Sequence, residues 1–142
     1  MLNPEVRAVV TKTIVSFFEG FTTIEFADDG SPSKSAEDFS LKYLPDGYVF
    51  VSMDVYGENC LTIYEGDDGI LSFNVGAVDT HAVDNDHRTY YAETHNGITY
   101  HVNEAQEDGY QSVVVWVQDG FSFKLGGCVA AEELLTAAYS LE

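Results

Sequence analysis

The first twenty residues carry apolar side chains at helical spacing. Asn3 suits a helix N-cap, Pro4 suits the first helical position, and Gly20 suits the residue after a helix end. The apolar positions between these signals are Val6, Val9, Val10, Ile14, Phe17 and Phe18. Because they recur every three or four residues, they predict an N-terminal helix that packs by one apolar stripe.

Residues 21–44 change pattern twice. Residues 21–27 alternate apolar and polar side chains, which predicts a strand. Residues 28–38 hold glycine, proline and three serines, and they predict a flexible loop. Residues 39–44 suit a short strand, and Pro45-Asp46-Gly47 predicts a turn after it.

From residue 48 to residue 125 the pattern is that of successive strands. Residues 48–56 are rich in β-branched and aromatic side chains. Three hairpins follow, whose predicted strand pairs are 61–65 with 70–75, 90–95 with 98–102, and 111–118 with 121–125. Their turns are Gly66-Asp67-Asp68-Gly69, Asn96-Gly97 and Asp119-Gly120, and the last two dipeptides tolerate the positive φ angles of tight hairpin turns.

The two-residue turn at Asp119-Gly120 fixes the register of the last hairpin. Gln118 pairs with Phe121, which places Trp116 opposite Phe123 on one face of the sheet. The opposite face of the same strand carries Val113, Val115 and Val117. A strand that is apolar on both faces is expected at the centre of a sheet that is covered on both sides.

The chain closes with a predicted helix over residues 130–141, in which Leu134, Leu135, Ala138 and Leu141 recur at helical spacing. Runs of strands framed by helices predict the α+β fold class. We expect a single α+β domain over residues 1–142. It has an N-terminal helix, a curved antiparallel sheet of about seven to eight strands built from hairpins, and a C-terminal helix.

The charge of the chain limits its partners. There are 24 Asp and Glu against 6 Lys and Arg, which gives a formal net charge of -18. A field of this sign repels phosphate backbones and excludes nucleic acid as a partner, whereas it favours a cation or a basic protein. Since no apolar run approaches the roughly 18 residues of a membrane span, we expect a soluble chain with no transmembrane segment.

The two cysteines, Cys60 and Cys128, are too few for a disulfide framework. They also form no Cys-x-x-Cys motif of the kind that binds metals or carries redox chemistry. The sequence leaves two states open, a disulfide in an oxidising compartment or two unpaired small apolar side chains.

One segment gathers residue types that bind metals. Residues 79–87 contain five of them, Asp79, His81, Asp84, Asp86 and His87. Calcium prefers several oxygen ligands and transition metals accept imidazole with carboxylate, so this segment is a candidate metal site. It does not follow the calcium-loop pattern, because the positions that need glycine and glutamate hold Thr89 and His95. The alternative is a solvated polar loop between two hairpins.

Tyr90, Tyr91 and Tyr100 fall on one predicted hairpin and form a candidate binding surface. Exposed tyrosines suit the recognition of proteins or carbohydrates, and core packing is the alternative. The two histidines of this hairpin, His95 and His101, do not form a metal pair. With Asn96-Gly97 as the turn, their side chains point to opposite faces of the sheet.

Short motifs along the chain resemble those of a family of bacterial domains, the domain-of-unknown-function family 4367 (DUF4367). The similar segments are Asn3-Pro4-Glu5-Val6-Arg7, Leu44-Pro45-Asp46-Gly47-Tyr48, Asp79-Thr80, Val115-Trp116, residues 119–125 and residues 132–141. Two positions depart from the family pattern. Ala130 stands where the family usually has a serine at the start of the last helix, and His81 stands where it usually has a glutamate.

The resemblance implies a cellular context. Domains of this family typically lie outside the cytoplasmic membrane of Gram-positive bacteria, often after a single membrane helix in anti-sigma-factor-like proteins. The chain is then the extracytoplasmic domain of a membrane-anchored regulatory protein, tethered through a membrane helix upstream of this sequence. The family has no known catalytic residues, so none is transferred.

Three functions follow from these observations. The first is a non-enzymatic sensor or binding module for an unknown protein or small-molecule ligand, with contacts on the sheet face or in the loops after Val78 and Glu104. The second is an acidic inhibitor or immunity-type protein that binds a basic partner. The third is a metal-dependent hydrolase built on residues 79–87. The chain has no Gly-x-Ser-x-Gly elbow and no phosphate-binding Gly-Lys-Ser/Thr loop, so we expect neither enzyme activity nor a cofactor.

Overall fold

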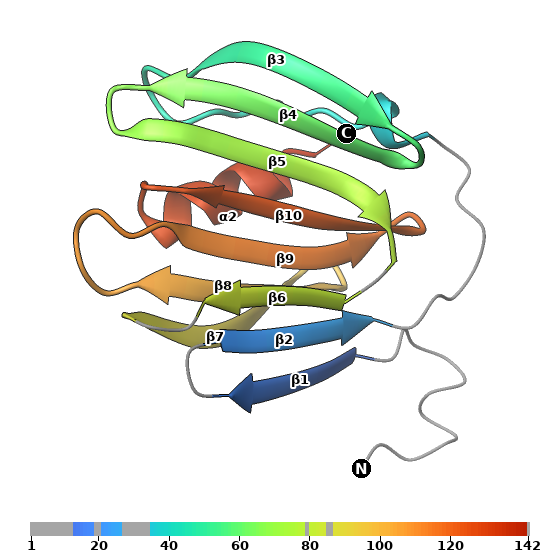
Figure 1. Cartoon of the computed structure of the whole chain (residues 1–142), viewed down its shortest axis with the longest axis vertical. Coiled ribbons are helices and arrows are strands. Elements are labelled where there is room, and N and C mark those ends of the chain that lie inside the picture. The colour runs from blue at the N-terminus through green and yellow to red at the C-terminus, as the bar shows by residue number, and fades with distance from the viewer. Residues whose placement is uncertain (1–12, 19–20, 27–34, 79, 85–86, 142) are drawn as a thin grey trace.

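The computed structural model describes residues 13–18, 21–26, 35–78, 80–84 and 87–141. These residues form two antiparallel sheets with one α-helix and one 3-10 helix (Figure 1). The larger sheet has seven strands in the order β3-β4-β5-β10-β9-β8-β7, and the smaller sheet has three in the order β1-β2-β6. The elements are β1 (Thr13–Phe18), β2 (Phe21–Phe26), η1 (Ala36–Asp38), β3 (Val49–Tyr56), β4 (Asn59–Gly66), β5 (Gly69–Ala77), β6 (Thr80–Asp84), β7 (Arg88–His95), β8 (Ile98–Ala105), β9 (Ser112–Gln118), β10 (Phe121–Gly127) and α2 (Ala131–Tyr139).

The larger sheet is covered on both faces, by different elements. On one face, α2 packs across β8, β9 and β10. On the opposite face, Ile24 of β2 and Val83 of β6 pack against Val113 and Val115 of β9. Figure 1 shows α2 and the smaller sheet on opposite sides of the larger one. The prediction that this strand is central and covered on both sides is therefore confirmed.

The main core lies between the larger sheet and α2. The Trp116 indole is 0% exposed and stacks on Phe123, with ring centroids 5.1 Å apart. Phe73 of β5 stacks against the same two rings at 6.5 and 6.1 Å. The predicted register is confirmed, because Trp116 lies opposite Phe123 and both residues of the Asp119-Gly120 turn have positive φ angles.

The other predicted hairpins are also present. β4 pairs with β5, and β7 pairs with β8 in the predicted register. Asn96-Gly97 has φ angles of 52° and 81°, which only a few residue types adopt at little cost. The turn at residues 45–47 forms as well, since the Tyr48 N–H donates to the Pro45 carbonyl oxygen at 3.2 Å.

The predicted N-terminal helix is wrong in its described part, because residues 13–18 form β1. β1 pairs with β2, and Val15 lies opposite Ile24. This segment combines β-branched and aromatic residues, so it suits a strand as well as its spacing suits a helix. The neighbouring β2 supplies backbone partners, and strand pairing prevails. Asn3, Pro4, Val6, Val9, Val10 and Gly20 lie outside the described residues.

Part of the predicted flexible loop at residues 28–38 is ordered. Residues 36–38 form the 3-10 helix η1, in which Ala36 is buried. The Ser35 N–H donates to the Asp38 carboxylate at 2.9 Å, as in a capping box. Residues 28–34 lie outside the described part of the chain.

The short strand predicted at residues 39–44 reduces to one β-bridge, between Leu41 and Leu141. Phe39 packs edge-on against Phe121 and Phe123, with centroids 5.3 and 5.0 Å away. Side-chain packing, rather than ladder pairing, therefore holds this segment against the sheet.

The polar segment at residues 79–87 is not the simple loop that its composition indicates. Residues 80–84 form β6, which pairs with β2 at the edge of the smaller sheet. Val83 lies opposite Thr22, and both are buried against the larger sheet. An edge strand with one buried apolar side chain has too weak an alternation to be seen in the sequence.

One edge of the larger sheet is apolar and exposed. β3 is the terminal strand of this sheet, and only its partner β4 pairs with it among the described strands. Its exposed apolar side chains are Val49, Phe50, Val51, Met53, Val55 and Tyr56. Phe50 continues the core face outward, since its ring meets Tyr64 edge-on at 6.3 Å.

The C-terminal helix is confirmed as α2 and buries one side against the sheet. Leu134 and Ala137 are 0% exposed, while Glu132 and Thr136 face solvent. The N-cap residue Ala130 makes no side-chain capping hydrogen bond. No helix in the described part of the chain is long and apolar enough to cross a membrane.

Replacement of Trp116 by alanine is expected to lower the free energy of unfolding by about 3–5 kcal/mol, because it leaves a large cavity among Phe73, Tyr100 and Phe123. Urea denaturation of both proteins measures the change. Tyr56→Ala on the exposed edge strand is the control, with an expected change within about 0.5 kcal/mol. Equal midpoints for Trp116→Ala and wild type contradict the packing described.

Replacement of Ala130 by serine is expected to stabilise the protein by about 1 kcal/mol. The backbone at Ala130 is already extended, with ψ of 143°, so a serine hydroxyl can accept a hydrogen bond from an N–H of the first turn. Thermal and urea unfolding measure the gain. Ala130→Val, which brings no acceptor, is the control and should give no gain. If Ala130→Ser destabilises the protein, the N-terminus of α2 does not lack a cap as described.

Candidate functional site

The candidate metal residues do not come together among the described side chains. His81 points inward, with its Nε2 3.0 Å from the Ser122 hydroxyl oxygen. His87 faces outward and contacts Glu107 at 3.1 Å. No group of three or more His, Cys, Asp or Glu in the described part of the chain is placed to hold a metal ion. Asp79, Asp86 and the side chain of Asp84 lie outside the described structure, so a metal site here stays a prediction.

The hydrogen bonds of Ser122 define the state of His81. The Ser122 hydroxyl donates its one proton to the Ala77 carbonyl oxygen at 2.8 Å. It therefore accepts from His81, which must carry its proton on Nε2. This imidazole links β6 to the larger sheet.

The three candidate tyrosines lie on two faces of the sheet. Tyr100 is 2% exposed and packs against Trp116 in the main core. Tyr91 is half-buried beside the same core. Tyr90 lies on the other face, with its hydroxyl oxygen 2.7 Å from Nδ1 of His101. The structure gives these three residues no common surface, and a binding role for them stays a prediction.

The predicted separation of the two histidines is confirmed. His95 stacks on Tyr139 of α2 with centroids 4.0 Å apart. His101 stacks on Tyr90 on the opposite face. A metal shared by these two imidazoles is therefore excluded by the geometry.

Polar side chains lie next to the apolar contact between the two sheets. His101 and Asn103 of β8 are both buried on the face towards the smaller sheet. Neither amide atom of Asn103 has a hydrogen-bond partner in the described structure. Burial lowers the pKa of the His101 imidazole, because the charged form loses solvation. Burial lowers the pKa of the Lys124 ammonium on the same face for the same reason.

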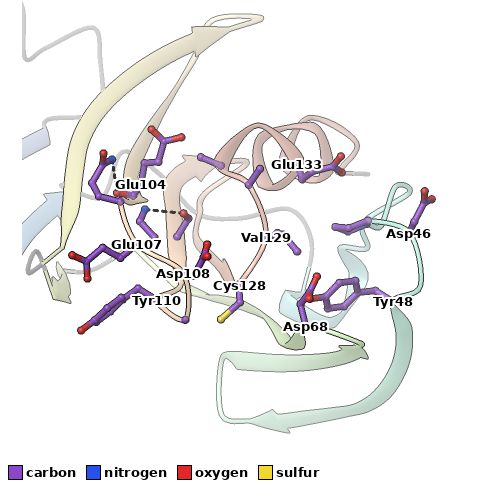
Figure 2. Close-up of a pocket in the computed structure, with 17 residues that line it drawn as sticks. Asp46, Tyr48, Asp68, Glu104, Glu107, Asp108, Tyr110, Cys128, Val129 and Glu133 are labelled. Atoms are coloured by element: carbon purple, nitrogen blue, oxygen red, sulfur yellow. Dashed lines mark hydrogen bonds between the residues drawn. The ribbon is translucent and has the colours of Figure 1, made fainter.

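A groove of about 620 Å³ opens where four segments meet near the start of α2 (Figure 2). This volume falls in the range of small-ligand sites in proteins. The segments are residues 45–48, Asp68 in the β4–β5 turn, residues 104–112 between β8 and β9, and residues 128–133 at the entry to α2. We call this cavity the acidic groove, for the residues described next.

Six acidic side chains line the acidic groove. They are Asp46, Asp68, Glu104, Glu107, Asp108 and Glu133. No lysine, arginine or histidine is among the described residues that line it. Figure 2 shows these acids distributed around the groove on separate segments rather than on one element. Six carboxylates around one cavity produce a strong negative potential inside it.

Two basic side chains, His87 and Arg88, contact the β8–β9 wall of the groove. His87 contacts Glu107 and stacks on Tyr110 with centroids 4.5 Å apart. The Arg88 Nε donates to the Gln111 carbonyl oxygen at 2.7 Å, and its guanidinium lies 5.7 Å from the centre of the Tyr110 ring. These contacts join the loop between β8 and β9 to the start of β7.

The opposite wall is positioned by contacts to α2. The Tyr43 hydroxyl donates to the Glu133 carboxylate at 2.5 Å. This hydrogen bond is the largest of the causes that raise the pKa of Tyr43. The N–H groups of Lys42 and Tyr43 donate to the Ser140 hydroxyl oxygen at 3.0 and 2.9 Å. The start and the end of α2 are thus both tied to the segment before the Pro45–Gly47 turn.

Tyr48 occupies an unusual place in the acidic groove. It is 7% exposed, and its hydroxyl oxygen has no hydrogen-bond partner in the described structure. Figure 2 shows the hydroxyl end of the ring directed towards Asp68 and Cys128. The ring packs against Gly66, where even a Cβ atom would lie 2.8 Å from it. Loss of solvation on burial, and then the charge of Asp68, raise the pKa of Tyr48, so the hydroxyl stays protonated.

Both cysteines are free in the structure. Cys60 is buried in the main core, and burial raises the pKa of its thiol. Cys128 is partly exposed and lines the acidic groove. Of the two states left open by the sequence, the structure shows the unpaired one.

Sequence reasoning located only part of this groove. The loop after Glu104 was an expected ligand contact, and it forms one wall. The role of Tyr48 was missed, because in the sequence it is the first aromatic residue of a strand. The one available signal was the motif Leu44-Pro45-Asp46-Gly47-Tyr48, three of whose residues line the groove.

Comparison with known proteins gives a family and no closer relative. The sequence profile described as domain of unknown function (DUF4367) matches residues 38–141. A search of the curated proteins and a search of the solved structures each found no match. All residues named in the lining of the acidic groove lie within the matched range.

The buried His101 is expected to make stability fall as the solution becomes acidic. Its pKa is lowered in the folded state, so its contribution is complete above the ordinary value of 6.5 and is lost progressively as the pH falls below it. The loss is about 1.4 kcal/mol for each tenfold reduction in proton affinity. Urea denaturation of wild type and His101→Asn between pH 7.5 and pH 5, values chosen around the ordinary pKa, compares the two slopes.

The asparagine variant keeps an acceptor for Tyr90 but has no proton to gain. Its stability should therefore depend less on pH than that of the wild type. His95→Asn, at an exposed position, is the control for loss of a histidine and should keep the wild-type slope. Parallel curves for wild type and His101→Asn contradict the assigned role of burial.

Proposed function

We propose that this chain, which belongs to the family of domains of unknown function DUF4367, is a non-enzymatic binding module that receives a basic partner in its acidic groove. The observation that carries this proposal is the lining of the groove, which holds six acidic residues from four segments and no described lysine, arginine or histidine. His87, which contacts Glu107, lies outside this lining. Carboxylates held around one cavity attract cations and steer basic molecules towards it.

The electrostatics of the whole chain act in the same direction. A net charge of -18 attracts a basic protein from a distance, and the groove then provides the place of contact. Four of these six acids are exposed and the other two are half-buried, so a partner can reach them from solvent. The interaction is therefore expected to be fast to form and sensitive to salt.

We further propose that the module lies outside the cytoplasmic membrane, in a regulatory protein anchored by an upstream membrane helix. This part of the proposal rests on the family resemblance rather than on the groove. A parent gene without any upstream apolar segment or export signal would contradict it. Deletion of residues 38–141 from such a parent should alter its signalling, and unchanged signalling would count against a sensory role.

The acidic groove also supports a second function, that of an inhibitor or immunity-type protein that blocks a basic active site. The same lining and the same net charge favour it. The two functions differ in outcome, because an inhibitor abolishes the activity of its partner whereas a sensor changes the activity of its own parent protein.

Neutralising acids in the groove is expected to weaken binding of a basic peptide. The variant is Asp46→Asn, Asp68→Asn and Asp108→Asn, and the probe is hexalysine, titrated by calorimetry at low and moderate salt. Three lost charge contacts should weaken binding roughly tenfold at low salt. The effect should shrink as salt rises, because the Debye length falls to about 10 Å at 0.1 M.

The matched control neutralises three exposed acids outside the groove, with Asp54→Asn, Glu58→Gln and Asp119→Asn. Both triple variants change the net charge by the same amount, so they separate a local site from the general field. Equal weakening by the two triples contradicts a groove site. As a second readout, bound peptide should slow alkylation of Cys128, while the buried Cys60 reports any unfolding.

A further inference from the structure

Within the acidic groove, one polar group stands apart from the solvated acids. The Tyr48 ring is 7% exposed, and its hydroxyl is buried without a partner among the described residues. Such a group usually destabilises the folded protein, because burial removes its hydrogen bonds to water and no other hydrogen bond replaces them. A buried polar group that is unsatisfied in the free protein and directed into a cavity calls for a partner from outside (Figure 2).

The surroundings of this hydroxyl restrict what the partner can be. Asp68 lies beside it in the β4–β5 turn, and after loss of solvation the charges of Asp68 and the nearby Asp67 raise the pKa of this hydroxyl. An anionic ligand would meet repulsion here. The phenol oxygen has lone pairs that can accept a hydrogen bond, and a cation with N–H groups supplies the donor.

We propose that the Tyr48 end of the acidic groove is a socket for a single alkylammonium group, the side chain of a lysine on the basic partner. This inference rests on the function proposed above and names the chemical group that the groove recognises. The ammonium donates to the Tyr48 hydroxyl oxygen and to the Asp68 carboxylate. The apolar side chains of Val129 and Ala131, which also line the groove, suit the methylene stem.

A metal ion fits these residues less well than an ammonium group. No described cluster of three or more His, Cys, Asp or Glu is placed to hold a metal, and a phenol that stays protonated is a poor metal ligand. The acids of the groove stand on separate segments, which suits a ligand that reaches several of them in turn.

The experiment titrates the isotope-labelled chain by NMR with the methylamide of N-acetyl-lysine. The neutral control probe is the corresponding norleucine derivative, which has the same stem without the ammonium. We expect saturable shifts at Asp68 and Val129 with the lysine probe and none with the norleucine probe. Tyr48→Phe, which keeps the ring, should weaken lysine binding roughly tenfold. Tyr56→Phe, on the exposed edge strand β3 and outside the groove lining, should change it less than twofold.

Comparing stability with binding distinguishes a binding role of the Tyr48 hydroxyl from a purely structural role. Tyr48→Phe removes an unsatisfied buried hydroxyl, so its unfolding midpoint should equal or exceed that of wild type while its binding falls. Gly66→Ala is the second variant. It forces the Tyr48 ring to move, since the new Cβ would lie 2.8 Å from it, and it should weaken binding with the hydroxyl still present.

Each outcome separates the socket from the proposed function. If hexalysine binds and Tyr48→Phe binds the lysine probe as wild type does, the socket is overturned and the groove function stands. If calcium chloride shifts the NMR signals at the Tyr48 end of the groove and the lysine probe does not, the socket is likewise overturned.

If neither hexalysine nor the lysine probe binds, both proposals are wrong. If the lysine probe binds more tightly than n-butylamine, the ammonium group belongs to a side chain of a partner protein. If n-butylamine binds more tightly, that assignment is overturned.

Discussion

The pairing of β9 with β10 determines which side chains enter each of the two cores. Along β9, residues alternate between the face towards α2 and the face towards the smaller sheet. A slip of one residue in this pairing would turn Trp116 towards the smaller sheet and would turn Val113 and Val115 towards α2. The Asp119-Gly120 turn prevents this slip, because its two positive φ angles fit one two-residue connection. Both layers over the sheet therefore depend on this hairpin.

Local signals predicted the parts of the fold that are locally determined. The turns at Asn96-Gly97 and Asp119-Gly120 specify the registers of their own hairpins, so β7 with β8 and β9 with β10 could be assigned from the sequence. β1 and β6 could not be assigned in this way. Residues 13–18 suit both a helix and a strand, and β6 shows one buried valine in a polar segment. Their structure is decided by β2, which lies between them.

The acidic groove illustrates a limit of sequence reasoning about sites. Its acids were visible as ordinary loop residues, and aspartate in hairpin turns needs no function to explain it. What makes them a site is that four segments meet whose acids lie up to 87 residues apart in the chain, from Asp46 to Glu133. Only the fold brings them together. Tyr48 was still less visible, since the burial of its hydroxyl without a partner among the described residues is a tertiary property.

The exposed strand β3 gives the acidity of the chain a consequence apart from recognition. Its open edge carries apolar side chains, with one aspartate and neither lysine nor proline to interrupt them. Such edges join to one another and lead to aggregation unless something keeps them apart. Two copies of this chain each carry a charge of -18, and their repulsion acts before the edges can meet. The charge that favours a basic partner thus also opposes association of two copies through this edge, and a partner that neutralises the charge would weaken that repulsion.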